Sequence, residues 1–319
     1  MMVGLVMAFT ASTAVAEKGY DQHPKFEQFA NELRLEHGIS KAQAREWLKD
    51  AKKQESVLKA ISRPAEKVKP WHDYRKIFLT NKRIKWGRAF LKKNKDIFDE
   101  VEKKYGVSRY IIASIIGVET FYGSRQGTYR VLDSLSTLAF DYPKRPLFWR
   151  ELKHFFVMAQ EQNFAPGDIK GSYAGAMGYG QFIPSSYRNY AVDGDGDGVV
   201  DLWKNKRDAI ASVANYFKRH GWKTGEDVTY RVSVTGDKFS EVANKSRKPK
   251  HTVKQLKQHG VKISQDLADD YKATLNELDG DEGKEYWLGL HNFYVITRYN
   301  HSRMYAMAVY QLSQELAAK

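Results

Sequence analysis

Apolar residues recur every three to four positions along most of the chain, with charged residues between them. That spacing places the apolar side chains on one face of a helix. It predicts helices within residues 24–60, through most of residues 84–221, and again around residues 305–312, near the end of the chain. The chain is therefore expected to be mainly helical.

The period changes in the segment "DVTYRVSVTG", residues 227–236. Val228, Tyr230, Val232 and Val234 alternate there with polar residues, which is typical of a half-buried strand. We therefore expect a mainly α protein of the α+β class, with one small β-containing unit.

Breaks in these patterns suggest where the chain divides. The segment "SRPAEKVKPWHDY" carries two prolines and mixed polarity, which indicates a connection between two lobes. The expected parts are a signal peptide at 1–16, a helical N-terminal lobe at 17–83, a helical core at 84–222, a small β-containing insertion at 223–283 and the C-terminal part of the core at 284–319.

The N-terminus resembles an export signal. An apolar stretch is followed by small residues that end in Ala14-Val15-Ala16, just before Glu17, although no Lys or Arg precedes the apolar stretch. A disordered tail or a different start codon is the alternative. The apolar run is too short to span a bilayer, and the chain has no cysteine for a lipid anchor. We expect a soluble periplasmic protein, without a transmembrane anchor and monomeric.

The net charge of +14 favours association with polyanions. Outside the cytoplasm these are cell-wall glycan, teichoic acid, lipid headgroups or stray nucleic acid. A generally solvated basic surface explains the same charge. A nucleic-acid binder would account for the charge but not for the export signal, so we expect no nucleic-acid partner.

Glu119 is the first candidate for chemistry. In "IIGVETFYGSRQG" it follows Ile112, Ile115 and Ile116 by seven, four and three residues, so it shares their helix face. A carboxyl group held against apolar side chains has a raised pKa, as a general acid near neutral pH requires. The alternative is a Glu at a helix end whose charge reaches solvent.

A glycine-rich segment, "GSYAGAMGYGQFIPSSYRNY", lies at residues 171–190. It lacks the lysine and the strand-to-helix context of a phosphate-binding loop. Its glycines permit close approach of the backbone to a ligand, and its tyrosines could stack on sugar rings. A structural turn with core aromatic residues explains the segment equally well.

The segment "DGDGDGVVDLW" has most of the spacing of an EF-hand calcium loop. Asp193, Asp195 and Asp197 alternate and Asp201 stands at the ninth position, but Lys204 occupies the twelfth, where a bidentate Glu is expected. A tight acidic turn without metal is the alternative. The nine histidines show no metal-ligand spacing, and no G-x-S-x-G motif is present.

Four segments together carry a family resemblance. They are "GVETFYG", "GSYAGAMGYGQFIPSSYRNYAVDGDGDG", "DAIASVANYFKRHGW" and "NFYVITRYNHSRMYAMAVYQL". In this order, and over most of residues 84–312, they resemble the B-type lytic murein transglycosylases, glycoside hydrolase family 103. The resemblance implies a lysozyme-like helical core, a helical N-terminal lobe and a small inserted β-containing domain.

The resemblance also implies an activity, cleavage of the β-1,4 bond between N-acetylmuramic acid and N-acetylglucosamine in peptidoglycan. Glu119 matches the catalytic acid and base of the family. The positions that match the glycan-binding groove are Ser172, Gln181, Tyr216, Tyr299 and Asn300. The positions that match the calcium site are Asp193, Asp195, Asp197, Val199 and Asp201. Lys204 and an extra residue within "KNKRDAI" depart from the pattern of that site.

The sequence offers no obvious second carboxylate, whereas ordinary glycosidases use two. Asp133 and Asp141 are candidates, but each is explained more simply as a cap or loop residue. The N-acetyl group of the substrate would then support the reaction, and the product would be a 1,6-anhydromuramyl end. No cofactor is expected for catalysis, a structural Ca²⁺ is possible, and the expected partners are peptidoglycan strands and cell-wall synthesis proteins. The rivals are a hydrolytic muramidase and a non-catalytic wall-binding protein.

Overall fold

The computed structural model describes residues 19–62, 69–142 and 144–318. Within these ranges the chain is mainly helical, as expected, and short 3₁₀ turns occur at Tyr20–Gln22, Pro166–Asp168 and Lys238–Glu241. The helices are α1 (Phe26–His37), α2 (Lys41–Lys49), α3 (Glu55–Ser62), α4 (Trp71–Phe78), α5 (Asn81–Lys93), α6 (Lys95–Tyr105), α7 (Arg109–Thr120), α8 (Val131–Asp141), α9 (Leu147–Glu161), α10 (Pro184–Tyr190), α11 (Lys206–Arg219), α12 (Val253–Gln258), α13 (His291–Tyr299) and α14 (Arg303–Ala317).

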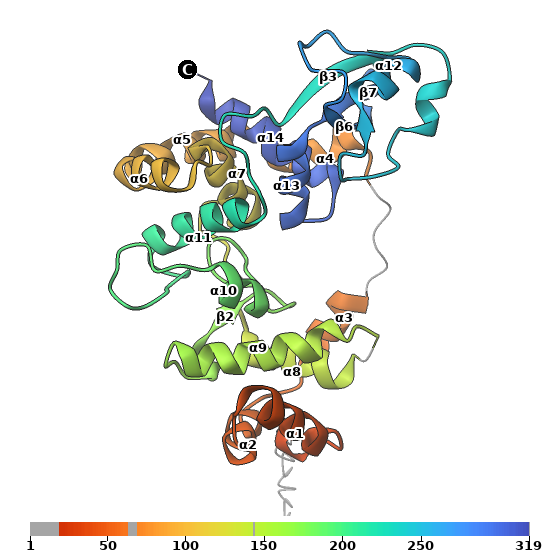
Figure 1. Ribbon diagram of the computed structural model, residues 1–319. Coiled ribbons are helices and arrows are strands. Elements are labelled where there is room, and N and C mark those ends of the chain that lie inside the picture. Colours follow the sequence, from red (N-terminus) through yellow and green to blue (C-terminus); the bar gives the residue numbers. More distant parts are fainter. Residues whose placement is uncertain (1–18, 63–68, 143, 319) are drawn as a thin grey trace, which may run out of the picture.

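The central helix α7 is almost entirely apolar and lies inside the molecule. Its residues from Ile111 to Gly117 are all buried. It packs against α14, α5, α11 and α6, which surround it in Figure 1. A helix that is apolar on all sides needs neighbours all round, so the sequence of α7 places it in the middle of the core.

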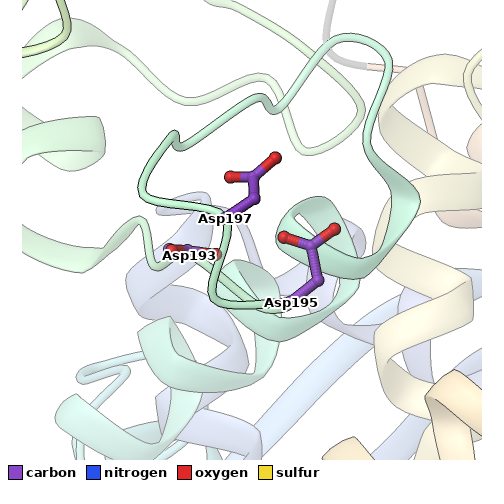
Figure 2. A group of neighbouring side chains, drawn as sticks. All are labelled: Asp193, Asp195 and Asp197. Carbon is purple, nitrogen blue, oxygen red and sulfur yellow. The ribbon is translucent and has the colours of Figure 1, made fainter.

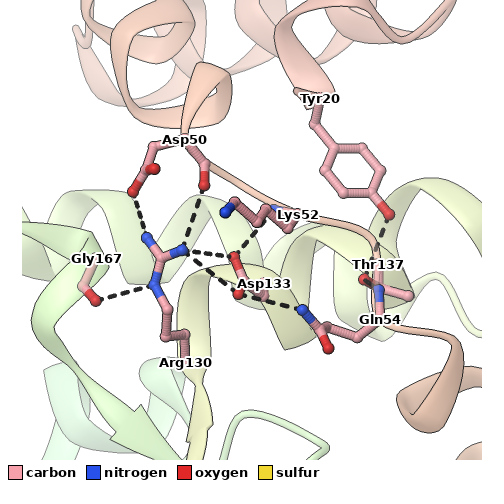
Figure 3. Close-up of polar contacts among 8 residues, drawn as sticks. All are labelled: Tyr20, Asp50, Lys52, Gln54, Arg130, Asp133, Thr137 and Gly167. Carbon is pink, nitrogen blue, oxygen red and sulfur yellow. Dashed lines mark hydrogen bonds and ion pairs between the residues drawn. The ribbon is translucent and has the colours of Figure 1, made fainter. Parts of the chain in front are cut away.

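The first helices pack onto α8 and α9, at the lower end of the molecule in Figure 1. Buried polar groups hold this junction. The Asp133 carboxylate accepts the backbone N–H of Lys52 at 3.0 Å and pairs with Arg130, and Thr137 accepts the backbone N–H of Gln54 (Figure 3). At the end of α8, Asp141 accepts the hydroxyl of Tyr20 at 2.5 Å. Both aspartates therefore serve the packing of the N-terminal helices.

The helix α4 behaves differently from α1–α3. It packs against α14 and the strand β6 (Lys272–Gly280), far from α3 in Figure 1. Its contacts therefore cross the expected boundary at residue 83 and place part of the N-terminal segment against α14 and the sheet.

The β-containing unit is a five-stranded antiparallel sheet in the order β4-β6-β7-β3-β5. Its strands are β3 (Thr229–Val234), β4 (His251–Thr252), β5 (Val261–Lys262), β6 and β7 (Gly283–Gly289). The alternating segment that predicted a strand is β3. The sheet has its own small apolar core around Leu256, Leu275 and Leu288, and it continues past residue 283 because β7 pairs with both β3 and β6.

Two further strands, β1 (Tyr129–Arg130) and β2 (Lys170–Gly171), form a small antiparallel pair that leads into the glycine-rich segment. None of the helices in the described ranges has the length and apolar character needed to cross a membrane. The expected signal peptide lies outside the described residues.

Candidate active site

Glu119 lies in the last turn of α7, on the face of Ile115 and Ile116, which are fully buried. Its side chain is half-buried, and the hydroxyl of Tyr305 donates a hydrogen bond to its Oε1 at 2.5 Å. Burial raises the pKa of Glu119 to about 7, although the Tyr305 hydrogen bond acts in the opposite direction. Desolvation therefore outweighs the hydrogen bond, and the carboxyl group is poised to give and take a proton near neutral pH.

The chain turns sharply after Glu119 through three consecutive residues with positive φ. These are Phe121 (50°), Tyr122 (58°) and Gly123 (87°). Left-handed backbone costs a non-glycine residue about 1 to 2 kcal/mol, so the two aromatic residues need tertiary support. Support comes from close packing, because the Tyr122 ring fills the space beside Gly87 and Gly117, where a Cβ atom would collide with it.

Two hydroxyl groups tie the glycine-rich segment to the end of α7 and to α13. Thr120 donates to the carbonyl of Tyr179 at 2.9 Å, and Tyr299 donates to the carbonyl of Gly180 at 2.5 Å. The side chain of Gln181, whose own φ is 52°, donates to Gly178 O at 3.1 Å. The segment is thus a fixed wall beside Glu119.

Aromatic side chains support the other end of this wall. The rings of Tyr216 and Tyr299 lie 4.8 Å apart, edge to face, and Tyr216 donates to the carbonyl of Arg298 at 2.6 Å. Burial raises the pKa of Tyr299, and the nearby negative charge of Glu119 raises it further. Tyr299 therefore lies within electrostatic reach of the acid.

The remaining two residues that matched the glycan groove are Ser172 and Asn300. The hydroxyl of Ser172 accepts the backbone N–H groups of Ala174 and Ala176, so it shapes the start of the glycine-rich segment. Asn300 is exposed and directly follows Tyr299. The structure therefore brings Tyr299 within electrostatic reach of Glu119 and links Gln181 and Tyr216 to the same wall.

Two tyrosines of this site were not singled out from the sequence. Tyr305, on α14, was assigned only to an apolar helix face, and Tyr74, on α4, lies in the segment taken for a connection. Burial raises the pKa of Tyr74, and the charge of Glu119 adds to the rise. A tyrosine on an apolar face has a hydroxyl that needs a partner, which is the only sequence clue to either residue.

The acidic loop is a separate site. One oxygen each of Asp193, Asp195 and Asp197 lies within 4.8 Å of the others, and Figure 2 shows the three carboxylates around the turn. Asp193 accepts the backbone N–H groups of Gly196 and Gly198, which lowers its pKa. Three close carboxylates are the hard oxygen donors that Ca²⁺ prefers, so the donor set fits this ion.

The rest of the loop is held by its own hydrogen bonds. Asp201 accepts the backbone N–H groups of Trp203 and Lys204, and Asn205 donates to Asp195 at 2.8 Å. Asp201 is thus not gathered with the first three aspartates. The fully buried Asp208 accepts the backbone N–H groups of Gly194 and Asp201, a role that no pattern in the sequence indicates.

Comparisons with known proteins agree with this architecture. Residues 21–314 match the family described as transglycosylase SLT domain. The chain is 42% identical over 308 residues to membrane-bound lytic murein transglycosylase B of Escherichia coli (strain K12), covering 93% of this chain and 84% of that protein.

Two solved structures are similar. The structure of the catenated lytic transglycosylase SltB1 from Pseudomonas aeruginosa matches with a TM-score of 0.91 and 48% identity, over 93% of this chain and 98% of that one. The Escherichia coli lytic transglycosylase Slt35 in complex with calcium matches with a TM-score of 0.85 and 42% identity, over 96% and 97%.

A lysozyme-like helical core with a small antiparallel sheet is the architecture of a class of enzymes that cleave glycans, the lytic transglycosylases. The chain belongs to the transglycosylase SLT family, among its B-type members. It is a lytic transglycosylase of peptidoglycan, a lyase.

Proposed function

We propose that Glu119 is the single acid and base of a non-hydrolytic cleavage between N-acetylmuramic acid and N-acetylglucosamine. One observation carries this proposal. The pKa of Glu119 is raised to about 7 by burial, and no other carboxylate among the described residues contributes to the rise. Asp133 and Asp141, the two alternative partners, are committed to the N-terminal helices.

The proposed reaction needs two proton transfers, and the carboxyl group of Glu119 makes both. Protonated Glu119 gives its proton to the glycosidic oxygen as the bond to C1 breaks, and the N-acetyl oxygen of the muramyl residue bonds to C1. The resulting carboxylate, held by Tyr305, then takes the proton of the C6 hydroxyl. O6 bonds to C1 and displaces the N-acetyl oxygen, so the product is a 1,6-anhydromuramyl end and Glu119 is protonated again.

The glycan groove is proposed to follow the wall beside Glu119, with Ser172, Gln181, Tyr216, Tyr299 and Asn300 along it. The hydroxyl groups of Tyr216 and Tyr299 already bind backbone carbonyls, which fixes the positions of their rings. Asn300 is exposed, so its amide is free to meet a sugar hydroxyl. Fixed aromatic rings and a few polar groups are what a sugar site requires.

Calcium is proposed as a structural ion of the acidic loop. Asp193, Asp195 and Asp197 would hold it. The carbonyl of Val199 and the carboxylate of Asp201, which lies apart from the three aspartates in this structure, would have to approach the ion to complete the set. The ion would supply a cross-link for the loop and no chemistry at Glu119. The relative solved with calcium supports this assignment.

The test is mass spectrometry of fragments released from purified peptidoglycan sacculi by the wild-type protein and by Glu119→Gln. Fragments one water lighter than hydrolytic products, and resistant to borohydride, are expected from the wild type alone. Reducible ends would instead identify a muramidase, and no release by the wild type would point to a wall-binding role.

A periplasmic location, a monomeric state and contacts with cell-wall synthesis proteins complete the proposal. Cell fractionation, light scattering and cross-linking in intact cells test these three points. Recovery of the native protein in the cytoplasmic fraction would contradict the first.

A further inference from the structure

The basic segment at residues 244–250, "NKSRKPK", has no role in the site described above. It carries four Lys or Arg residues and no acidic residue. In the structure it lies against α13, where Arg247, Lys248, Arg298 and His301 line a hollow of about 230 Å³, called here the basic hollow. No carboxylate is among the side chains that line it.

These cations are not paired within the part of the chain that the structure describes. The ion pairs between described residues include none of Arg247, Lys248 and Arg298. The pKa of His301 is lowered, first by burial and then by the charges of Arg247 and Arg298. An excess of unpaired positive charge in a hollow attracts an anion.

The hollow is built from anchored backbone. Arg247 donates to the carbonyl of His301 at 3.0 Å, and Arg303 donates to the carbonyl of Asn244 at 2.7 Å. On the sheet side, Asn244 exchanges hydrogen bonds with the backbone of Glu277 in β6. The basic segment is therefore fixed between the sheet and the turn that joins α13 to α14.

That turn is part of the active-site surroundings. Tyr299 precedes it and lies within electrostatic reach of Glu119, while Tyr305 follows it and binds Glu119 directly. His301 is two residues from Tyr299, so their Cα atoms lie within about 7 Å of each other. A peptide of four residues spans up to about 14 Å, so a peptide attached to a sugar beside Tyr299 can reach the hollow.

We propose that the basic hollow binds the carboxylates of the stem peptides that muramyl residues carry, and so selects peptide-bearing glycan over naked glycan. The proposal rests on the proposed cleavage at Glu119. Stem peptides bear several free carboxylates close to the lactyl group, whereas the sugars of the glycan are neutral. Guanidinium and ammonium groups form charge-assisted hydrogen bonds with carboxylates.

The experiment compares the full-length protein with a double charge reversal, Lys248→Glu with Arg298→Glu. The matched control is Lys85→Glu with Lys92→Glu, two exposed lysines of α5 with the same change in net charge. Substrates are purified glycan strands with intact stem peptides, strands with amidated stem carboxylates, and strands stripped of peptides. Thermal unfolding of each variant shows that it is folded.

The hollow variant is expected to show a kcat/KM about fivefold lower on peptide-bearing strands. A loss of this size is typical when two partly exposed contacts between opposite charges are removed. Its rates on naked strands and on amidated strands should equal those of the wild type. The control pair should show no selective loss. Equal losses on all three substrates, or no loss on any, would overturn the proposal.

A binding measurement separates this proposal from the proposed reaction. The affinity of Glu119→Gln for the same strands is compared with and without the hollow substitutions. A stem-dependent difference in affinity supports the hollow even if no anhydro product forms. Vesicles of phosphatidylglycerol and phosphatidylcholine test the alternative partner. Loss of vesicle binding by the hollow variant, without any stem-dependent difference, would assign the hollow to lipid headgroups and overturn the proposal.

Discussion

The surroundings of Glu119 and the acidic loop are two polar sites built in opposite ways. The loop takes its three carboxylates from five consecutive residues, and its hydrogen bonds are mostly local. The residues around Glu119 belong to α4, α7, α13 and α14. Tyr305, the hydrogen-bond partner of Glu119, is 186 positions away along the chain. Local spacing defines the loop, whereas long-range packing sets the chemistry of Glu119.

The largest expected effect is that of Glu119→Gln. Loss of the proposed proton donor should lower kcat by about a thousandfold, since general acid catalysis contributes roughly 10²- to 10⁴-fold. Asp141→Asn, which removes a carboxylate of the N-terminal junction, is the control and should keep most activity. Near-normal turnover of the glutamine variant would exclude Glu119 as the acid.

The wild-type pH profile belongs to the same prediction. In the proposed mechanism Glu119 is protonated at the start of the reaction, and burial raises its pKa to about 7. The rate should therefore fall as pH rises through about 7. A rate that stays constant between pH 6 and pH 9 would contradict the assignment.

A pair of glycine substitutions sharpens the contrast in packing. In Gly117→Ala the new Cβ would lie 2.7 Å from ring atoms of Tyr122, so the turn after Glu119 must shift. Overpacking of this kind costs about 1 to 3 kcal/mol of unfolding free energy, and activity should fall with it. In Gly196→Ala the Cβ meets nothing within 4 Å, and only its φ of +80° opposes the change.

Gly196→Ala should therefore cost about 1 kcal/mol and leave kcat unchanged. Chemical denaturation and steady-state kinetics on both variants provide the measurement. A larger loss of activity in Gly196→Ala than in Gly117→Ala would reverse the proposed difference between the two regions.

Tyr305→Phe tests the long-range partner. The Tyr305 hydroxyl stabilises the Glu119 carboxylate, so its removal should raise the pKa of Glu119 further. The descending limb of the pH profile should move to higher pH, with a loss of kcat of up to about tenfold at the optimum, because one hydrogen bond to a charged group is worth about 1.5 kcal/mol or more. If the descending limb of the pH profile did not move, the Tyr305 hydrogen bond would have no effect on the ionisation that controls the rate.

The smallest effect is expected from calcium. If Ca²⁺ binds the loop, it should raise the Tm of the wild type in proportion to the logarithm of its concentration above the Kd. Asp195→Asn should abolish this rise and leave kcat intact. Asp237→Asn, at an exposed aspartate outside the loop, is the matched control. A calcium-dependent kcat would link the two regions.

The contrast between local spacing and long-range packing also explains which features could be predicted from the sequence. The strand β3 follows from alternation, and α7 and α14 follow from helical periodicity, because each pattern is complete within its own segment. The β-containing unit was expected to end at residue 283, yet β7 continues to Gly289, because its pairing with β3 and β6 outweighs local propensity. Tyr74, Tyr305 and Asp208 were missed because their roles arise only from contacts between distant segments.

The contact between Tyr305 and Glu119 has a consequence for timing. A ribosome synthesises the chain from its N-terminus, so α14, the last helix, emerges after every other element. Until α14 docks, the Tyr305 hydroxyl does not reach the Glu119 carboxyl group, and the burial that raises the pKa of Glu119 is incomplete. If Glu119 is the acid, as proposed, a chain still under synthesis should be unable to cut glycan, and the activity should appear only once the last helix has docked.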